Sequence, residues 1–98
     1  MTINKIRDGE KLTVALEGRL DTTTAPQLEG ELRTAIEGIK ELEFDLAKLD
    51  YISSAGLRVL LTAQKAMNRQ GSLVVRNANE DIMEIFDVTG FSDILNIE

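Results

Sequence analysis

The sequence lacks the two side chains on which much hydrolytic and metal chemistry depends. Its 98 residues include no cysteine and no histidine. Without cysteine there is no disulfide, no thiolate nucleophile and no thiolate zinc site. Without histidine, a Ser-His-Asp or Cys-His hydrolase and the usual histidine-rich zinc or iron site are excluded as well. Carboxylates remain as ligands for hard metal ions, but no calcium-loop motif is present, so we expect no metal site, cofactor or catalytic centre.

Basic residues and long apolar runs are also scarce. The chain has 11 Lys and Arg against 17 Asp and Glu, a net charge of −6. An acidic chain without a local basic cluster repels a phosphate backbone, so nucleic-acid binding is not expected. The longest apolar runs, such as Val59-Leu60-Leu61, fall far short of the ~20 residues of a membrane span, and the first residues form no apolar signal segment. We therefore expect a cytoplasmic protein that binds no membrane.

Alternating or short apolar segments predict strands at four places along the chain. A hairpin turn at Asp8-Gly9 is predicted between the first two of them. The four segments are residues 3–6, 12–16, 42–46 and 73–75. Residues 47–51 are predicted to form a loop.

Apolar residues at helical spacing predict three helices between and after the later strands. The first helix is expected to start at Thr24, with Gln27 completing a capping box. The other two helices are expected to start at Ser53–Gly56 and at Asn79, and to end at Gly71 and Gly90. The resulting order β-β-α-β-α-β-α predicts one α/β domain over residues 1–98, with a mixed, mostly parallel sheet of about four strands flanked by helices.

Loops beyond the carboxyl ends of parallel strands are the usual working sites of such sheets, and two are candidates here. They are Gly18–Thr24 and Lys48–Gly56. The simplest interpretation is structural: Ser53 or Ser54 caps a helix, and Asp21 closes a turn with a local hydrogen bond. The functional interpretation makes Ser54 a phosphorylation switch, because a phosphate would meet backbone donors at a helix start yet add roughly −1.5 to −2 charges to an acidic surface.

Three blocks of sequence carry a family resemblance that covers nearly the whole chain. They are Gly18-Arg19-Leu20-Asp21, the segment from Asp45-Leu46 through Asp50-Tyr51-Ile52-Ser53-Ser54-Ala55-Gly56-Leu57-Arg58-Val59-Leu60-Leu61, and Val88-Thr89-Gly90-Phe91. Together they resemble a STAS domain of the bacterial anti-sigma factor antagonist (anti-anti-sigma factor) family. Ser54 matches the position that is phosphorylated in this family. Ser53 stands where many members have Asp, which makes it a second candidate acceptor, and Ala55 replaces a frequent Ser or Thr.

The resemblance implies a partner switch in which the protein is ligand and substrate, not enzyme. The unphosphorylated form would bind an anti-sigma factor that is also a serine kinase and so free a sigma factor. Phosphorylation of Ser54 would end that binding, and a PP2C-type phosphatase would restore it. By the matching motifs, the partner would contact Asp21, Thr22, Ser53, Ser54, Gly56, Leu57 and Arg58. We expect the free protein to be a monomer.

Two other interpretations of the sequence stay open. The chain could be a constitutive STAS scaffold or interaction module, such as a subunit of a transporter or signalling complex, in which Ser54 is only a helix cap. It could instead be an enzyme or a small-ligand binder that uses its acidic loops. No phosphate-binding loop, dinucleotide-binding glycine motif or hydrolase elbow supports the second of these.

Overall fold

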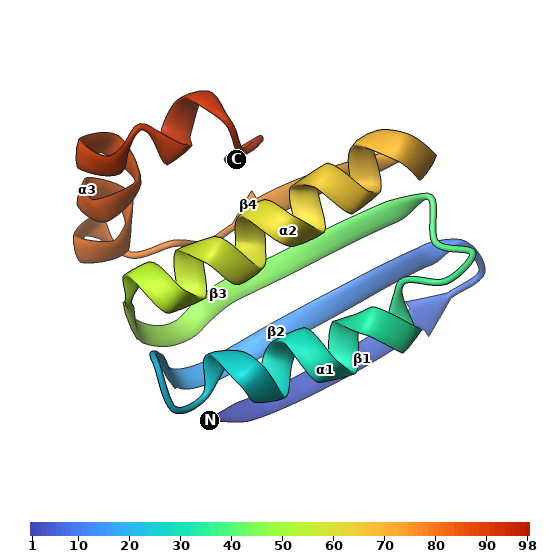
Figure 1. The fold of residues 1–98 in the computed structure, drawn as a ribbon, viewed down its shortest axis with the longest axis horizontal. Coiled ribbons are helices and arrows are strands. Elements are labelled where there is room, and N and C mark those ends of the chain that lie inside the picture. Colours follow the sequence, from blue (N-terminus) through green and yellow to red (C-terminus); the bar gives the residue numbers. More distant parts are fainter.

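The computed structural model describes residues 1–98 as a four-stranded sheet with two long helices on one face (Figure 1). The strands are β1 (Thr2–Asp8), β2 (Lys11–Leu20), β3 (Glu41–Ile52) and β4 (Ser72–Arg76). The helices are α1 (Ala25–Ala35), α2 (Ser54–Gln70), α3 (Glu80–Thr89) and a 3-10 turn η1 (Phe91–Asp93). The sheet order is β1-β2-β3-β4, with β1 antiparallel to β2 and the other neighbours parallel. The predicted fold class and element order are confirmed.

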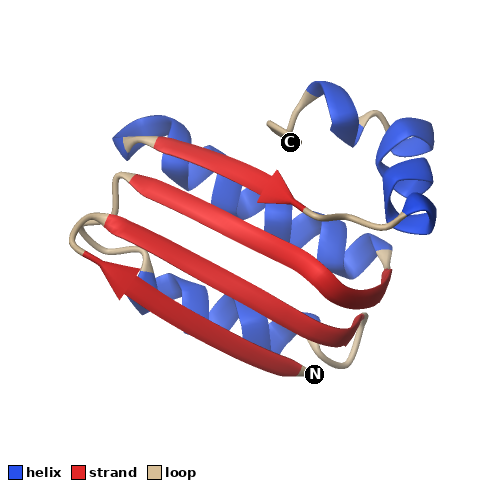
Figure 2. Ribbon diagram, turned by 180° about the vertical axis from the view of Figure 1, so that it is seen from behind, coloured by secondary structure: helices blue, strands red, loops and turns tan.

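Buried apolar side chains fill the space between the sheet and its helices. The alternating residues Leu12, Val14 and Leu16 of β2 are each at most 2% exposed, as their spacing predicts. Phe44 of β3 and Leu60 of α2 are fully buried against them. The opposite face of the sheet carries no helix (Figure 2). None of the helices is long and apolar enough to cross a lipid bilayer.

The prediction of a loop at residues 47–51 is wrong, because β3 continues to Ile52. Two register shifts, between Ala15 and Glu17 and between Gly18 and Arg19 of β2, insert extra residues into β3. From the first bulge onward the buried side chains of β3 recur every third residue, at Leu46, Leu49 and Ile52, each at most 1% exposed. A bulge breaks the two-residue period of a strand. The longer strand carries the start of α2 to the end of the sheet.

All three helices start at their predicted positions, and the predicted side-chain cap forms in two of them. The Asn79 side chain accepts the amide of Ile82 at 2.8 Å, and Gly90 ends α3 with a φ of 81°. The predicted capping box at α1 is wrong, since the side chain of Thr24 makes no cap bond. Gln27 instead donates to the Glu31 carboxylate at 3.4 Å. The start of α1 is held by Asp21, as described below.

The C-terminal tail pairs with the free edge of β4. Ile97 forms a parallel bridge with Val75. Val75 donates its amide to Asn96 at 2.9 Å and accepts the amide of Glu98 at 2.9 Å. Pairing of this kind removes unsatisfied backbone groups from a sheet edge.

Candidate functional site

The two candidate loops meet at one end of the sheet. The last residues of β2 and β3 pair side by side, Arg19 with Tyr51 and Leu20 with Ile52. The amide of Ser53 then donates to the carbonyl of Leu20 at 2.9 Å, which ties the start of α2 to the end of β2. Both loops lie at the left end of the sheet in Figure 1. The turn after β2 and the first turn of α2 therefore form one surface.

The two adjacent serines have different roles in the helix start. Ser53 is the N-cap: its Oγ accepts the amide of Gly56 at 3.4 Å, and its carbonyl accepts the amide of Leu57 at 2.9 Å. Ser54 is the first residue of α2 and is exposed. Its hydroxyl makes no hydrogen bond within the protein. The cap expected at one of these serines is thus Ser53, and the hydroxyl of Ser54 stays free.

Gly56 lets α2 approach the ends of both strands. A Cβ at this position would lie 2.7 Å from Leu20 Cγ and 2.9 Å from Ile52 Cγ1. Those side chains are at most 1% exposed and cannot move aside easily. Leu57 is also buried, at 5% exposure. These two predicted contact residues therefore shape the surface from beneath, whereas Ser54 and Arg58 point outward from the same turn.

Asp21 organises the turn that leads into α1. Its Oδ1 accepts the amide of Thr23 at 3.0 Å, the hydroxyl of Thr23 at 2.7 Å and the amide of Thr24 at 3.2 Å. Its carbonyl accepts the amide of Ala25 at 2.8 Å. The Thr23 hydroxyl, helped by both backbone amides, lowers the pKa of Asp21 below its usual value. Thr22 stands exposed at the tip of this turn, beside a fixed carboxylate.

Arg19 connects the two loops, and the sequence reasoning did not single it out by itself. Its guanidinium carbon lies 4.4 Å from the centre of the Tyr51 ring, and its Nε lies 3.7 Å from Asp21 Oδ2. The arrangement joins a cation–π contact to an ion pair. Tyr51 lies in β3 and is 38% exposed. The only signal for Arg19 was its place within the Gly18–Asp21 block.

Arg58 lies one helical turn after Ser54 and forms no ion pair. It lines a hollow of about 200 Å³ between the starts of α1 and α2, together with Thr22 and Ala55. Five of the seven predicted contact residues are thus gathered, wholly or partly exposed, at one end of the molecule. They are Asp21, Thr22, Ser53, Ser54 and Arg58.

Comparison with known proteins places the chain in a family. The family model described as "Mlab, STAS domain" matches residues 3–96. BtrV of Bordetella bronchiseptica, which carries the name of an anti-sigma factor antagonist, is 39% identical over 99% of this chain and 84% of its own length. The anti-sigma-B factor antagonist of Listeria monocytogenes is 34% identical over 96% of this chain and 84% of its own.

A solved structure shows the same fold at lower sequence identity. The anti-sigma factor antagonist SpoIIAA in its unphosphorylated form superposes with a TM-score of 0.79, at 17% identity, over 99% of this chain and 87% of its own. The phosphorylated form of this Bacillus protein gives a TM-score of 0.78, also at 17% identity, over 99% and 91%. By family model, relatives and fold, the chain belongs to the STAS domain family, in the group of the bacterial anti-sigma factor antagonists.

Proposed function

We propose that this protein is an anti-sigma factor antagonist whose binding is controlled by phosphorylation of Ser54. In its unphosphorylated form it binds an anti-sigma factor that is also a serine kinase, and so frees a sigma factor in the cytoplasm. It is a ligand and a kinase substrate, and it catalyses no reaction itself. The observation that carries the proposal is the free, exposed hydroxyl of Ser54 at the start of α2.

Ser54 is favoured over Ser53 as the acceptor because Ser53 is already engaged. Ser53 is only partly exposed, and a kinase would first have to free its Oγ from the amide of Gly56. A phosphate on Ser54 would disturb no existing bond. It would also lie at the positive end of the dipole of α2, which favours negative charge. The helix is therefore expected to tolerate the modification.

The phosphate would act on the partner through charge. It adds roughly −1.5 to −2 charges to a surface that already holds the ionised Asp21. One charge pair ~4 Å apart at an effective dielectric of ~20 is worth about 4 kcal/mol, and every ~1.4 kcal/mol changes affinity tenfold. Even strong solvent screening leaves enough to release a partner. A PP2C-type phosphatase would then return the protein to its binding state.

The test is a capture experiment from native lysate with wild type, Ser54→Ala and Ser54→Asp as baits. We expect a serine kinase of the anti-sigma type with wild type and Ser54→Ala, but not with Ser54→Asp. Ser72→Asp is the matched control, because it adds the same charge at an exposed serine at the start of β4. Thermal unfolding checks that every bait is folded. Equal capture by all baits would make the chain a constitutive STAS module and overturn the switch.

The acceptor is identified by phosphorylating the protein with the captured kinase. Trypsin releases residues 49–58 as one peptide, which contains both serines. Fragmentation of that peptide then tells Ser54 from Ser53. We expect the phosphate on Ser54 in wild type and none on the peptide from Ser54→Ala. Modification of Ser53 in both proteins would contradict the assignment.

A further inference from the structure

The charges of this acidic protein are divided unevenly along the chain. Residues 77–98 hold six acidic and no basic residues, which equals the whole net charge of −6. In contrast, α2 carries three basic residues, Arg58, Lys65 and Arg69, and no acidic one. All three are exposed and none forms an ion pair. Their spacing of seven and four residues places them in one row along the helix.

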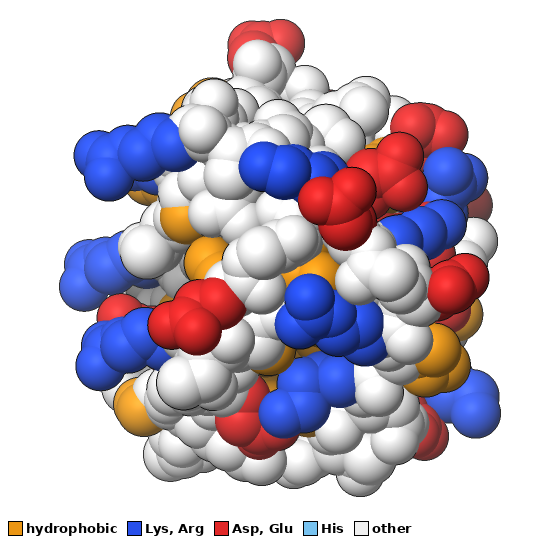
Figure 3. All heavy atoms as spheres, turned by 90° about the vertical axis from the view of Figure 1, so that its right-hand side faces the viewer, with side chains coloured by type: hydrophobic (Ala, Val, Ile, Leu, Met, Phe, Trp, Pro, Cys, Tyr) orange, Lys and Arg blue, Asp and Glu red, His pale blue; other side chains and the backbone are white.

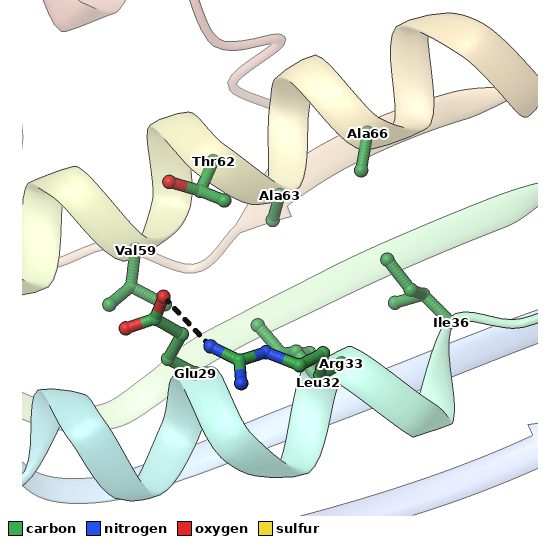
Figure 4. A pocket seen from close by; sticks show the side chains of 8 residues that line it. All are labelled: Glu29, Leu32, Arg33, Ile36, Val59, Thr62, Ala63 and Ala66. Atoms are coloured by element: carbon green, nitrogen blue, oxygen red, sulfur yellow. Dashed lines mark hydrogen bonds and ion pairs between the residues drawn. The ribbon is translucent and has the colours of Figure 1, made fainter.

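This basic row borders a groove between α1 and α2. One hollow of the groove has a volume of about 200 Å³, and Figure 4 shows side chains from both helices around it. Its lining residues are Glu29, Leu32, Arg33, Ile36, Val59, Thr62, Ala63 and Ala66. The second hollow shares Glu29, Val59 and Thr62 with it and extends the groove to Thr22, Ala55 and Arg58. The groove therefore runs along most of both helices.

The floor of the groove is apolar and its border is positive. Leu32 and Val59 are each 5% exposed at its base, and small side chains of α2 such as Ala63 and Ala66 keep it open. On the α1 side the only charges lining it are Glu29 and Arg33, which pair with each other at 3.5 Å and so cancel. Of the α2 row, Arg58 lines the groove, whereas Lys65 precedes the lining residue Ala66 and Arg69 follows it by three residues on the same helix. In Figure 3 basic side chains project along the left edge, which is the side of the molecule that bears the helices.

We propose that the groove between α1 and α2 docks an amphipathic helix with an acidic flank, supplied by a protein partner. The apolar floor would take side chains at i, i+3, i+4 and i+7 of that helix, and the acidic flank would face Arg58, Lys65 and Arg69. From Ala55 to Ala66 the groove follows about 16 Å of α2 at ~1.5 Å per residue, so an occupant of about three turns fits it. The excess of acidic charge in residues 77–98 repels a longer polyanion such as a nucleic acid.

This inference rests on the groove and goes beyond the switch at Ser54. The probe is a synthetic helical peptide of about 14 residues with leucine at i, i+3, i+4, i+7 and i+11 and glutamate on the flanks. A matched peptide carries lysine in place of glutamate. Each is titrated into the full-length, ¹⁵N-labelled protein while amide resonances are followed by NMR, at low and at high salt.

We expect the acidic peptide to shift amides of the facing sides of α1 and α2 and the lysine peptide to leave them unchanged. The double variant Lys65→Gln/Arg69→Gln should weaken binding several-fold, as high salt should in wild type. Lys11→Gln/Lys48→Gln removes two charges from side chains that pair with Glu43 and Glu17 of the sheet, and should bind like wild type. Thr62→Trp, at an exposed position of the groove, should block the site without altering charge.

Several results would overturn the proposal. These are equal shifts of the amide resonances with both peptides, shifts confined to another surface, and no shift at all. Binding that neither Lys65→Gln/Arg69→Gln nor Thr62→Trp weakens would overturn it as well. Ser54→Asp separates this proposal from the switch, because Ser54 does not line the groove and its variant should still bind the peptide. A protein that fails the peptide test but switches its captured partner at Ser54 would refute the groove alone.

Discussion

The two turns at the carboxyl ends of β2 and β3 are built in opposite ways. After β2, the Asp21 carboxylate accepts the amides of Thr23 and Thr24 and the Thr23 hydroxyl, and the Thr24 hydroxyl donates to the carbonyl of Arg19 at 2.8 Å. After β3, Ser53 makes one cap bond of 3.4 Å and the Ser54 hydroxyl makes none. Hydrogen bonds of its own side chains lock the turn after β2, whereas the turn after β3 leaves the hydroxyl of Ser54 without a hydrogen bond. A surface that recognises a partner needs a fixed turn, and a residue that is phosphorylated needs a free hydroxyl.

The arrangement of the two turns depends on α2 lying tightly against the ends of β2 and β3. We expect Gly56→Ala to disturb this packing most. The new Cβ would overlap the buried side chains of Leu20 and Ile52. We expect a loss of about 1–3 kcal/mol in the free energy of unfolding, although alanine favours helix over glycine. Gly30→Ala in α1 is the matched control, because a Cβ there has nothing within 4 Å. Urea unfolding of both variants decides, and equal stabilisation by both would contradict the packing argument.

The division of roles between the two serines is tested by replacing each with alanine. Ser53→Ala removes the cap of α2 and should lower the free energy of unfolding by about 1 kcal/mol. Ser54→Ala removes a hydroxyl without partners and should change it by less than about 0.5 kcal/mol. Chemical unfolding of the two variants side by side measures the difference. A larger loss for Ser54→Ala would show that Ser54 is the structural residue.

The locked turn has a pH signature. The pKa of Asp21 is lowered in the folded protein, first by the Thr23 hydroxyl and then by backbone amides, so folding favours the ionised carboxylate. Its stabilising effect is therefore complete above the unfolded value of 3.8 and is lost as pH falls through the lower folded value. Wild type should have a larger free energy of unfolding than Asp21→Ala at neutral pH. This gap should close as the pH falls below 3.8 and the carboxyl of Asp21 becomes protonated in the folded protein. A gap independent of pH would exclude the carboxylate as its cause.

Much of this fold could be predicted from the sequence because its signals are local. The alternation of Leu12, Val14 and Leu16 marks a regular strand, and Asn79 marks a helix start by its own side chain. The end of β3 escaped prediction because each bulge is set by the neighbouring strand, whose register β3 must follow. The start of α1 at Thr24 was predicted, but its capping box was not found, because Asp21, three residues before Thr24, closes the turn instead.

The candidate site divides in the same way. Ser54 and its neighbours lie in one continuous block, so the sequence alone pointed to them. The basic row did not stand out, because Arg58, Lys65 and Arg69 are scattered along the chain and only a helix aligns them. The groove beside that row is formed by α1 as well as α2, and the whole of strand β3 separates these two helices in the sequence. Local chemistry is readable from sequence, whereas surfaces shared by two helices depend on packing.

A mainly local effect is expected at Arg19, the side chain that connects the two turns. Arg19→Ala removes its stack on Tyr51 and its ion pair with Asp21, and should lower stability by only about 0.5–1 kcal/mol because the side chain is largely exposed. The local effect should be clearer. Tyr51 is the only tyrosine in a chain without tryptophan, so its fluorescence reports this contact alone, and acrylamide should quench it more strongly in the variant.

Arg33→Ala is the control for that measurement, since Arg33 is an exposed arginine whose ion-pair partner is Glu29. It should leave the quenching of Tyr51 unchanged. If Arg19→Ala also leaves it unchanged, the stack does not persist in solution and the two turns are joined only through the backbone pairing of β2 with β3. If quenching rises, the locked turn and the Ser54 turn are coupled through one side chain. Removal of Arg19 should then weaken capture of the partner without changing the response to Ser54→Asp.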